Sequence, residues 1–157
     1  MKSTDYNELI LGLISSFDPP AVAVHEDPAG LEGVYAQLPG RFPKLYEQFL
    51  LSYHWEDVDL ISMRLLANPG ISRLLSSLLY DPYMSKMLLA KGYIPFARAA
   101  DGGYDPICFD ISVRKGNRDC QIVWVDHEEV LCNSKIVIRE IIAPSFEDLV
   151  IHFVVGV

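Results

Sequence analysis

The densest group of polar side chains in the sequence is Asp126-His127-Glu128-Glu129. Carboxylates and imidazoles ligate metal ions and act as general acids and bases. However, four adjacent residues on a turn cannot all converge on one point, and no His-x₃-His pair or cysteine completes a ligand set. A nucleophile, a base and an orienting group are not gathered here either. We interpret this stretch as a structural turn or a partner contact, and we predict no catalytic residues and no metal ligands.

The loop Asp101-Gly102-Gly103-Tyr104-Asp105 is a second candidate site. Its two glycines permit positive φ and a close approach of the backbone, which suits either a hairpin turn or a loop that contacts a ligand or partner. It is not a phosphate cradle, because no Gly-Lys-Ser/Thr follows and its two aspartates would repel phosphate.

Trp55 next to His54, Glu56, Asp57 and Asp59 makes the third candidate. A tryptophan within an acidic rim either anchors an interface or packs on the core, and both readings stay open. The candidate partner-contact residues are therefore Trp55, Glu56, Asp57, Asp59, Asp101, Tyr104, Asp105, Asp126, His127, Glu128 and Glu129.

The remaining nucleophile and ligand types show no functional pattern. No Gly-x-Ser-x-Gly elbow occurs, and Cys108 and Cys120 lie in apolar runs that are typical of small core residues. Three cysteines without a Cys-x-x-Cys pair argue against a disulfide framework or a structural zinc site. His25 and His152 are expected on a loop and a helix face, and we expect no cofactor.

Composition limits the possible partners. The net charge is −8, with 21 acidic against 13 basic residues, so a dominant role in nucleic-acid binding is not expected. Such a surface instead steers basic partners. The acids Asp5 and Glu8 do not suit a leader peptide, and the apolar run Val150–Val157 is too short to span a bilayer. We predict one domain over residues 1–157, in the cytoplasm and without a membrane segment.

Helical periodicity and capping signals predict the elements that position these candidates. Apolar residues at helical spacing occur over residues 5–17, 31–38, from about 43, over 71–79, from 81, and from 145 to the C-terminus. Asp5 with Glu8, Asp81 with Pro82, and Ser145 with Asp148 are expected to begin three of these helices.

After Gly92 the pattern changes to short strands, predicted at Tyr93–Ala99, Tyr104–Ile111, Gln121–Val125 and Lys135–Ile142. Leu60–Leu66 is a further possible strand. Pro106 would place its strand at an edge or a bulge, and Gln121–Val125 should be central because it is apolar. Together this predicts an α+β fold with a largely antiparallel sheet of about four to six strands, flanked by N-terminal, middle and C-terminal helices.

Several stretches in order resemble a known family. They are Leu38–Leu50 (LPGRFPKLYEQFL), Gly92–Ala97 (GYIPFA), Gly103–Asp110 (GYDPICFD), Val123–Glu129 (VWVDHEE) and Ala143–Leu149 (APSFEDL). Together they resemble the SUKH superfamily, whose founding branch is the Smi/Knr-type cell-wall regulators of fungi. The resemblance extends over roughly residues 31–153 and implies a mixed, largely antiparallel sheet with surrounding helices and no cofactor.

The resemblance also implies a function. Bacterial members look like immunity proteins that bind and neutralise a toxin domain, often a nuclease or deaminase. This sequence departs from the pattern at His54-Trp55, where such proteins often carry Asn-Gly, and in a longer helical region, Ile71–Lys91. The branch and the toxin therefore stay open.

Three hypotheses follow. The leading one is a non-catalytic immunity protein whose acidic stretches meet a basic toxin domain such as a nuclease. The second is a regulatory scaffold that binds cellular partners. The third is a small-molecule-binding or enzymatic domain, which would need a deep pocket with convergent polar groups. A pocket lined by Tyr104, Asp105, His127 and Glu128 would favour it. The sequence predicts no oligomeric state.

Overall fold

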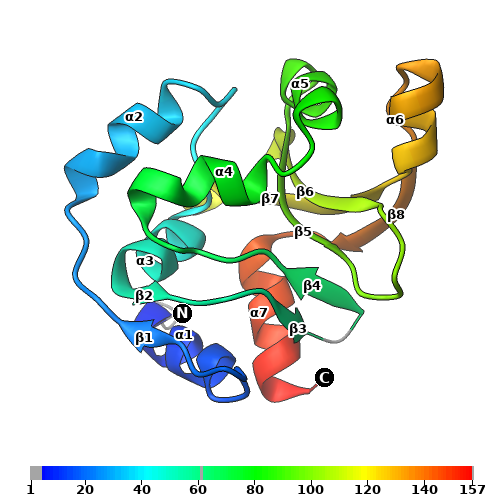
Figure 1. The fold of residues 1–157 in the computed structure, drawn as a ribbon. Coiled ribbons are helices and arrows are strands. Elements are labelled where there is room, and N and C mark those ends of the chain that lie inside the picture. Colours follow the sequence, from blue (N-terminus) through cyan, green and yellow to red (C-terminus); the bar gives the residue numbers. More distant parts are fainter. Residues whose placement is uncertain (1–4, 61, 157) are drawn as a thin grey trace.

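The computed structural model describes residues 5–60 and 62–156 and is built around a six-stranded antiparallel sheet (Figure 1). The strand order is β3-β4-β5-β6-β7-β8, so each strand pairs with the next along the chain. The strands are β3 (Val58–Leu60), β4 (Met63–Leu65), β5 (Tyr93–Ala99), β6 (Pro106–Arg114), β7 (Cys120–Val125) and β8 (Ile138–Ala143). The predicted α+β class is confirmed, and β5 has the predicted bounds.

Helices precede the sheet, interrupt it and close the chain. They are α1 (Tyr6–Ile14), α2 (Leu31–Tyr35), α3 (Lys44–Ser52), α4 (Leu74–Leu78), α5 (Pro82–Ala90), α6 (His127–Asn133) and α7 (Phe146–Val155). A small second sheet pairs β1 (Val22–Ala23) with β2 (Tyr53–His54). Within the described ranges, none of the helices combines the length and apolarity needed to cross a membrane.

Side-chain caps begin three helices at the predicted residues. Asp5 accepts from the backbone N–H of Asn7 at 3.0 Å, Asp81 from that of Met84 at 3.0 Å, and Ser145 Oγ from that of Asp148 at 3.0 Å. Each cap satisfies a first-turn N–H group that has no partner within its helix. These capping signals were therefore read correctly from the sequence.

The two faces of the sheet pack against different helices. Ile107 and Phe109 on β6 belong to the main core, which also holds residues of α1, α3 and α7. Cys108, between them in sequence, points the other way into a smaller cluster with Met84 and Leu88 of α5 and with residues of β7 and α6. Figure 1 accordingly shows α1 and α7 on one side of the sheet and α5 and α6 on the other.

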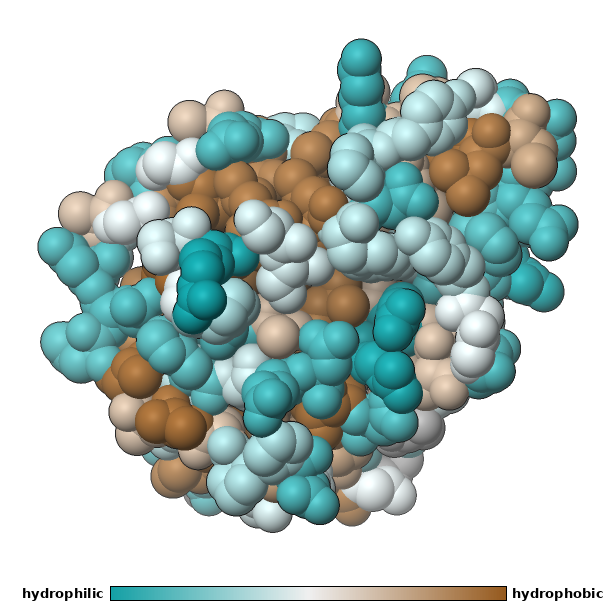
Figure 2. Space-filling model, in the orientation of Figure 1, coloured by the Kyte–Doolittle hydropathy of each residue, from teal (hydrophilic) through white to brown (hydrophobic). Residues whose placement is uncertain are grey.

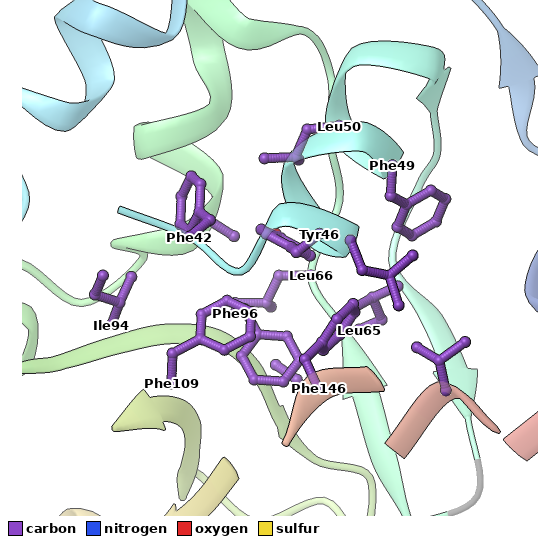
Figure 3. Packing of buried hydrophobic residues seen from close by; sticks show 14 of the residues in the cluster. Phe42, Tyr46, Phe49, Leu50, Leu65, Leu66, Ile94, Phe96, Phe109 and Phe146 are labelled. Atoms are coloured by element: carbon purple, nitrogen blue, oxygen red, sulfur yellow. The ribbon is translucent and has the colours of Figure 1, made fainter. Parts of the chain in front are cut away.

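Aromatic rings tie the helices to the sheet at the centre of the main core (Figure 3). Phe96 and Phe109, on neighbouring strands, are stacked with ring centroids 4.1 Å apart. Tyr46 of α3 meets Phe109 edge to face at 5.0 Å, and Phe146 of α7 meets it at 5.6 Å. Such pairs add to the stabilisation from burial, so this cluster fixes both helices on the sheet.

A β-bulge in β5 decides which face its last residues occupy. Pro95 pairs with Cys108, but Ala97, two residues further along, pairs with Ile107. Strict alternation would put Arg98 on the same face as Ile94, towards the main core. The extra residue in β5 reverses this, so Arg98 points towards the face that carries α5 and α6.

Two predictions about strands need correction. Of the two predicted places for the strand that contains Pro106, the edge is wrong, because β6 pairs with both β5 and β7. A bulge does occur in its pairing with β5, between Pro95 and Ala97. Pro106 is the first residue of β6, where the missing N–H is tolerated. The predicted strand Leu60–Leu66 is instead the β3–β4 hairpin, in which Leu60 pairs with Met63. Ile61 within it, like the start of the chain over residues 1–4, lies outside the described residues.

Asp126–Glu129 is also not a turn, because Asp126 is the N-cap of α6. Its Oδ1 accepts from the backbone N–H groups of Glu128 at 3.0 Å and Glu129 at 3.3 Å. The acidic first turn is the charge pattern that a helix N-terminus favours. The adjacent polar residues Asp126–Glu129 therefore mark the beginning of a helix.

Candidate functional site

The candidate stretches meet along one end of the large sheet. Asp59 on β3 lies opposite Arg64 on β4, Arg64 lies opposite Arg98 on β5, and Arg98 lies opposite Pro106 on β6. Residues directly opposite each other in an antiparallel sheet point to the same face, so Asp59, Arg64 and Arg98 form one line. The backbone N–H of Ala100 donates to the Ser62 carbonyl at 3.0 Å and holds the β3–β4 turn against the loop after β5.

This line continues through the loop after β5 to α6 and β8. We call the whole set the polar row, and its members are Asp59, Arg64, Arg98, Tyr104, Asp105, His127 and Arg139. The Tyr104 hydroxyl donates to Asp81 at the start of α5, which places this part of the row on the face that carries α5 and α6. In Figure 2, strongly hydrophilic residues lie over the β3–β4 hairpin, where the row begins.

Asp105 is the structural centre of the row. It is only 4% exposed, and its carboxylate accepts four hydrogen bonds. The backbone N–H and ring Nδ1 of His127 donate to Oδ1 at 2.9 and 2.6 Å. The indole Nε1 of Trp124 and Nη1 of Arg139 donate to Oδ2 at 2.8 and 2.7 Å. One carboxylate therefore joins the loop after β5 to β7, α6 and β8.

These contacts hold Asp105 in its ionised form. Burial by itself would raise the pKa of this carboxyl group. The hydrogen bonds from His127, Trp124 and Arg139 outweigh burial and lower the pKa of Asp105 to about 2. Because an ionised carboxylate can only accept hydrogen bonds, Nδ1 of His127 must carry a proton. In the neutral imidazole, Nε2 is then left as an acceptor on a half-buried ring.

One ligand atom each from Asp105, Asp126 and His127 lies within 4.8 Å of the others, a spacing that could hold a metal ion. However, these groups already have other partners. Asp105 accepts four hydrogen bonds, Asp126 caps α6, and the Arg139 guanidinium contacts the same Asp105 carboxylate. A metal ion would have to displace the Arg139 guanidinium from Asp105 and remove the Asp126 cap from α6. We therefore assign no metal to this group.

At the other end of the row, Arg64 has a carboxylate partner and Arg98 has none within ion-pair distance among the described residues. Asp59 forms an ion pair with Nε of Arg64 at 2.8 Å, and both side chains are exposed. The hydrogen bond from Arg64 lowers the pKa of Asp59 below its usual value. Arg98 is half-buried and forms no ion pair or side-chain hydrogen bond with any residue in the described ranges.

Trp55 belongs to the core, which corrects its place among the partner-contact candidates. It is 4% exposed and stacks on Phe49 with centroids 3.9 Å apart. Its indole Nε1 donates to the carbonyl of Leu66 at 3.0 Å. Because its side chain is buried in the main core, Trp55 offers almost no surface to a partner.

Of the other predicted acids, several serve local structure. Asp57 accepts from the backbone N–H of Ala67 at 2.7 Å, and Asp101 accepts from that of Gly103 at 2.8 Å, which closes the turn at Gly102 with its φ of 84°. Glu129 accepts from Asn133 within α6. Glu56 and Glu128 are exposed, and no side-chain hydrogen bond of theirs is found within the described ranges.

Sequence reasoning missed the three arginines of the row. Arg64, Arg98 and Arg139 are separated by more than thirty residues each, so they form no basic cluster in the sequence. The available signal was an arginine inside each of three β-rich stretches. A charged residue within a strand either faces solvent or has a specific partner.

A cleft of about 430 Å³ lies away from the row, between β2 and the turn before α4. Its lining includes Glu26, His54, Gly70 and Arg73. Its lining includes none of Tyr104, Asp105, His127 and Glu128, so it is not the pocket that would favour the small-molecule hypothesis.

The fold is an antiparallel meander with helices packed on both of its faces. The polar row lies at one end of this sheet. Comparison with protein families gives a match to the SMI1 / KNR4 family (SUKH-1) over residues 27–152. The chain belongs to this family, as the resemblance predicted. Searches of curated proteins and of solved structures find no match.

Proposed function

We propose that this chain is a non-catalytic protein-binding domain and that the polar row is its contact surface. We further propose that it is a cytoplasmic immunity protein that neutralises the cognate toxin of a polymorphic or contact-dependent system. Membership of the SMI1 / KNR4 family supports this, because immunity proteins are common among SUKH proteins.

The observation that carries the proposal is the way in which the row is held. Asp105 fixes His127 and Arg139 by hydrogen bonds, and Asp59 fixes Arg64. Side chains that are already ordered before association lose little conformational entropy on binding. Asp59, Arg64 and Arg98 also lie side by side across the sheet. The one convergent group is at Asp105, and its carboxylate is already occupied by His127, Trp124 and Arg139. This arrangement suits contact with a surface better than chemistry on a small substrate.

The charge of the chain fits a basic partner. With a net charge of −8, it would speed association with a nuclease-like domain whose active face must attract phosphate. Glu128, next to His127, and Glu56, three residues before Asp59, are exposed acids near the row in sequence that could meet such a face.

The test is co-expression with the product of a toxin-like reading frame beside the gene. We expect a stable complex on gel filtration and survival of cells that the toxin alone kills. The absence of both a complex and protection would contradict the immunity function. A complex with other cellular proteins, without any toxin neighbour, would favour the regulatory scaffold instead.

A further inference from the structure

Arg98 has an unusual position within the polar row. The bulge between Pro95 and Ala97 turns it away from the main core, and it lies directly opposite Arg64. Like charges directly opposite each other in a sheet are destabilising. Asp59 forms its hydrogen bonds with Arg64, and Arg98 has no ion-pair partner among the described residues. Asp59 is still near enough for the positive charge of Arg98 to lower the pKa of its carboxyl group.

The surroundings of Arg98 are aromatic on one side. Burial raises the pKa of the Tyr80 and Tyr104 phenols, and the nearby positive charge of Arg98 opposes that rise. The two rings meet edge to face at 5.7 Å. Tyr104 already donates to Asp81, and the shielded Tyr80 hydroxyl has no hydrogen-bond partner within the described part of the chain. Arginine and tyrosine together form the kind of surface on which binding energy concentrates.

The charge around Arg98 limits what can bind it. Asp59 bonds to Arg64 opposite Arg98, Asp81 accepts from the Tyr104 hydroxyl, and Asp101 follows Arg98 by three residues. These acids would repel a polyphosphate chain. A single carboxylate avoids most of this repulsion, and its two oxygens match the planar fork of a guanidinium. An isolated acidic side chain therefore fits this position better than a nucleic acid does.

We propose that Arg98 receives the carboxylate of an aspartate or glutamate side chain from the partner protein. This inference rests on the proposed function and narrows it. The partner's contact face must carry an acidic residue opposite Arg98, within a surface that is otherwise basic.

The first test compares Arg98→Gln with Arg73→Gln, a control at an exposed arginine outside the row. The probe is the purified product of the toxin-like reading frame, and the readout is its dissociation constant. We expect Arg98→Gln to weaken binding roughly 10- to 100-fold and Arg73→Gln to leave it unchanged. Equal affinities for wild type and Arg98→Gln would overturn the inference but leave the proposed function standing.

Thermal unfolding separates this role from a structural one. Because Arg98→Gln removes a repulsion with Arg64, we expect a midpoint equal to or above that of the wild type. A clear fall in the midpoint would mean that Arg98 supports the fold, which contradicts the inference.

A second test needs no partner. The side-chain Nε–H signals of the arginines are followed by NMR during titration with N-acetylglutamate amide, which carries one carboxylate, at low salt, with N-acetyllysine amide as control. We expect N-acetylglutamate amide to shift the Arg98 signal more than those of Arg64 and Arg139, which already have carboxylate partners. Equal shifts at all three, no shift at Arg98, or a larger shift with a single-stranded oligonucleotide would overturn the inference. This result is decisive even if no complex with a toxin forms.

Discussion

Asp105 shows how much of the surface depends on a single residue. Its carboxylate is nearly enclosed and accepts four hydrogen bonds, two of them from His127 and one each from Trp124 and Arg139. Removing one member of such a group leaves the others with unsatisfied hydrogen-bond donors, and this cost exceeds the net contribution of any single bond.

We therefore expect Asp105→Asn to lower the free energy of unfolding at pH 7 by about 2–3 kcal/mol. The folded-state pKa of about 2 lies below the usual value for an aspartate, so the ionised carboxylate stabilises the fold at neutral pH. This contribution is complete above about pH 4 and is lost as the pH falls through about 2. Urea unfolding between pH 7 and pH 2 measures both effects.

Because Asp105→Asn has no carboxylate at this position, its free energy of unfolding should fall less than that of the wild type as the pH is lowered from about 4 to 2. Asp101→Asn is a control, because this aspartate is exposed and makes one local hydrogen bond. If Asp105→Asn and Asp101→Asn had the same stability and the same pH profile, Asp105 would not be the centre that we describe.

The sequence identified Asp105 and His127 as candidates but not their relation. Their separation of more than twenty residues hides a contact that only strand pairing creates. Trp55 was ambiguous for a different reason. Its acidic neighbours are visible in the sequence, whereas the stacking on Phe49 that buries it depends on tertiary packing.

At the scale of elements, α7 depends on a residue outside its own sequence. The buried Asp119, just before β7, accepts from the backbone N–H groups of Phe146 at 2.7 Å and Glu147 at 3.1 Å. It also accepts from the N–H of Cys120 at 2.8 Å. A negative charge at a helix N-terminus is favourable, so Asp119 joins α7 to the sheet in addition to the cap at Ser145.

We expect Asp119→Asn to destabilise the protein by about 2 kcal/mol, because the charge is lost and an amide cannot accept at both former oxygen positions. Hydrogen exchange should accelerate first in the initial turn of α7. Ser145→Ala removes the local cap alone and should cost about 1 kcal/mol. A smaller effect for Asp119→Asn than for Ser145→Ala would mean that α7 relies on its own cap.

Elements with local signals were predictable. The caps at Asp5, Asp81 and Ser145, and the strand Tyr93–Ala99, are encoded by residues a few positions apart. The missed helix α6 also had a local signal, since Asp126 followed by Glu129 three positions later is a capping pattern. From the sequence we interpret these polar residues as a turn or a partner contact, and that interpretation misses the helix.

At the scale of the whole molecule, the polar row is a product of sheet register. Asp59, Arg98 and Arg139 come from three distant parts of the chain, and the meander brings them to one end of the sheet. Register and the bulge in β5 are set by the packing of the core, so no local pattern could have placed these residues together.

The central claim is that this end of the sheet binds the partner, and Tyr104→Ala tests it most directly. Tyr104 lies in the middle of the row, between the Tyr80 ring and the His127 ring, whose centroid is 5.6 Å from its own. Tyr6 on α1 is a matched control, because it is also a half-buried tyrosine with one side-chain hydrogen bond at 3.1 Å. It packs against the main core, on the opposite face of the sheet from the polar row.

The measurement is the dissociation constant of each variant with the co-expressed toxin-like product, by titration calorimetry. We predict that Tyr104→Ala weakens binding at least about tenfold, whereas Tyr6→Ala stays within about twofold of the wild type. Unchanged affinity for Tyr104→Ala, or equal losses for the two variants, would contradict the assignment of the polar row as the contact surface.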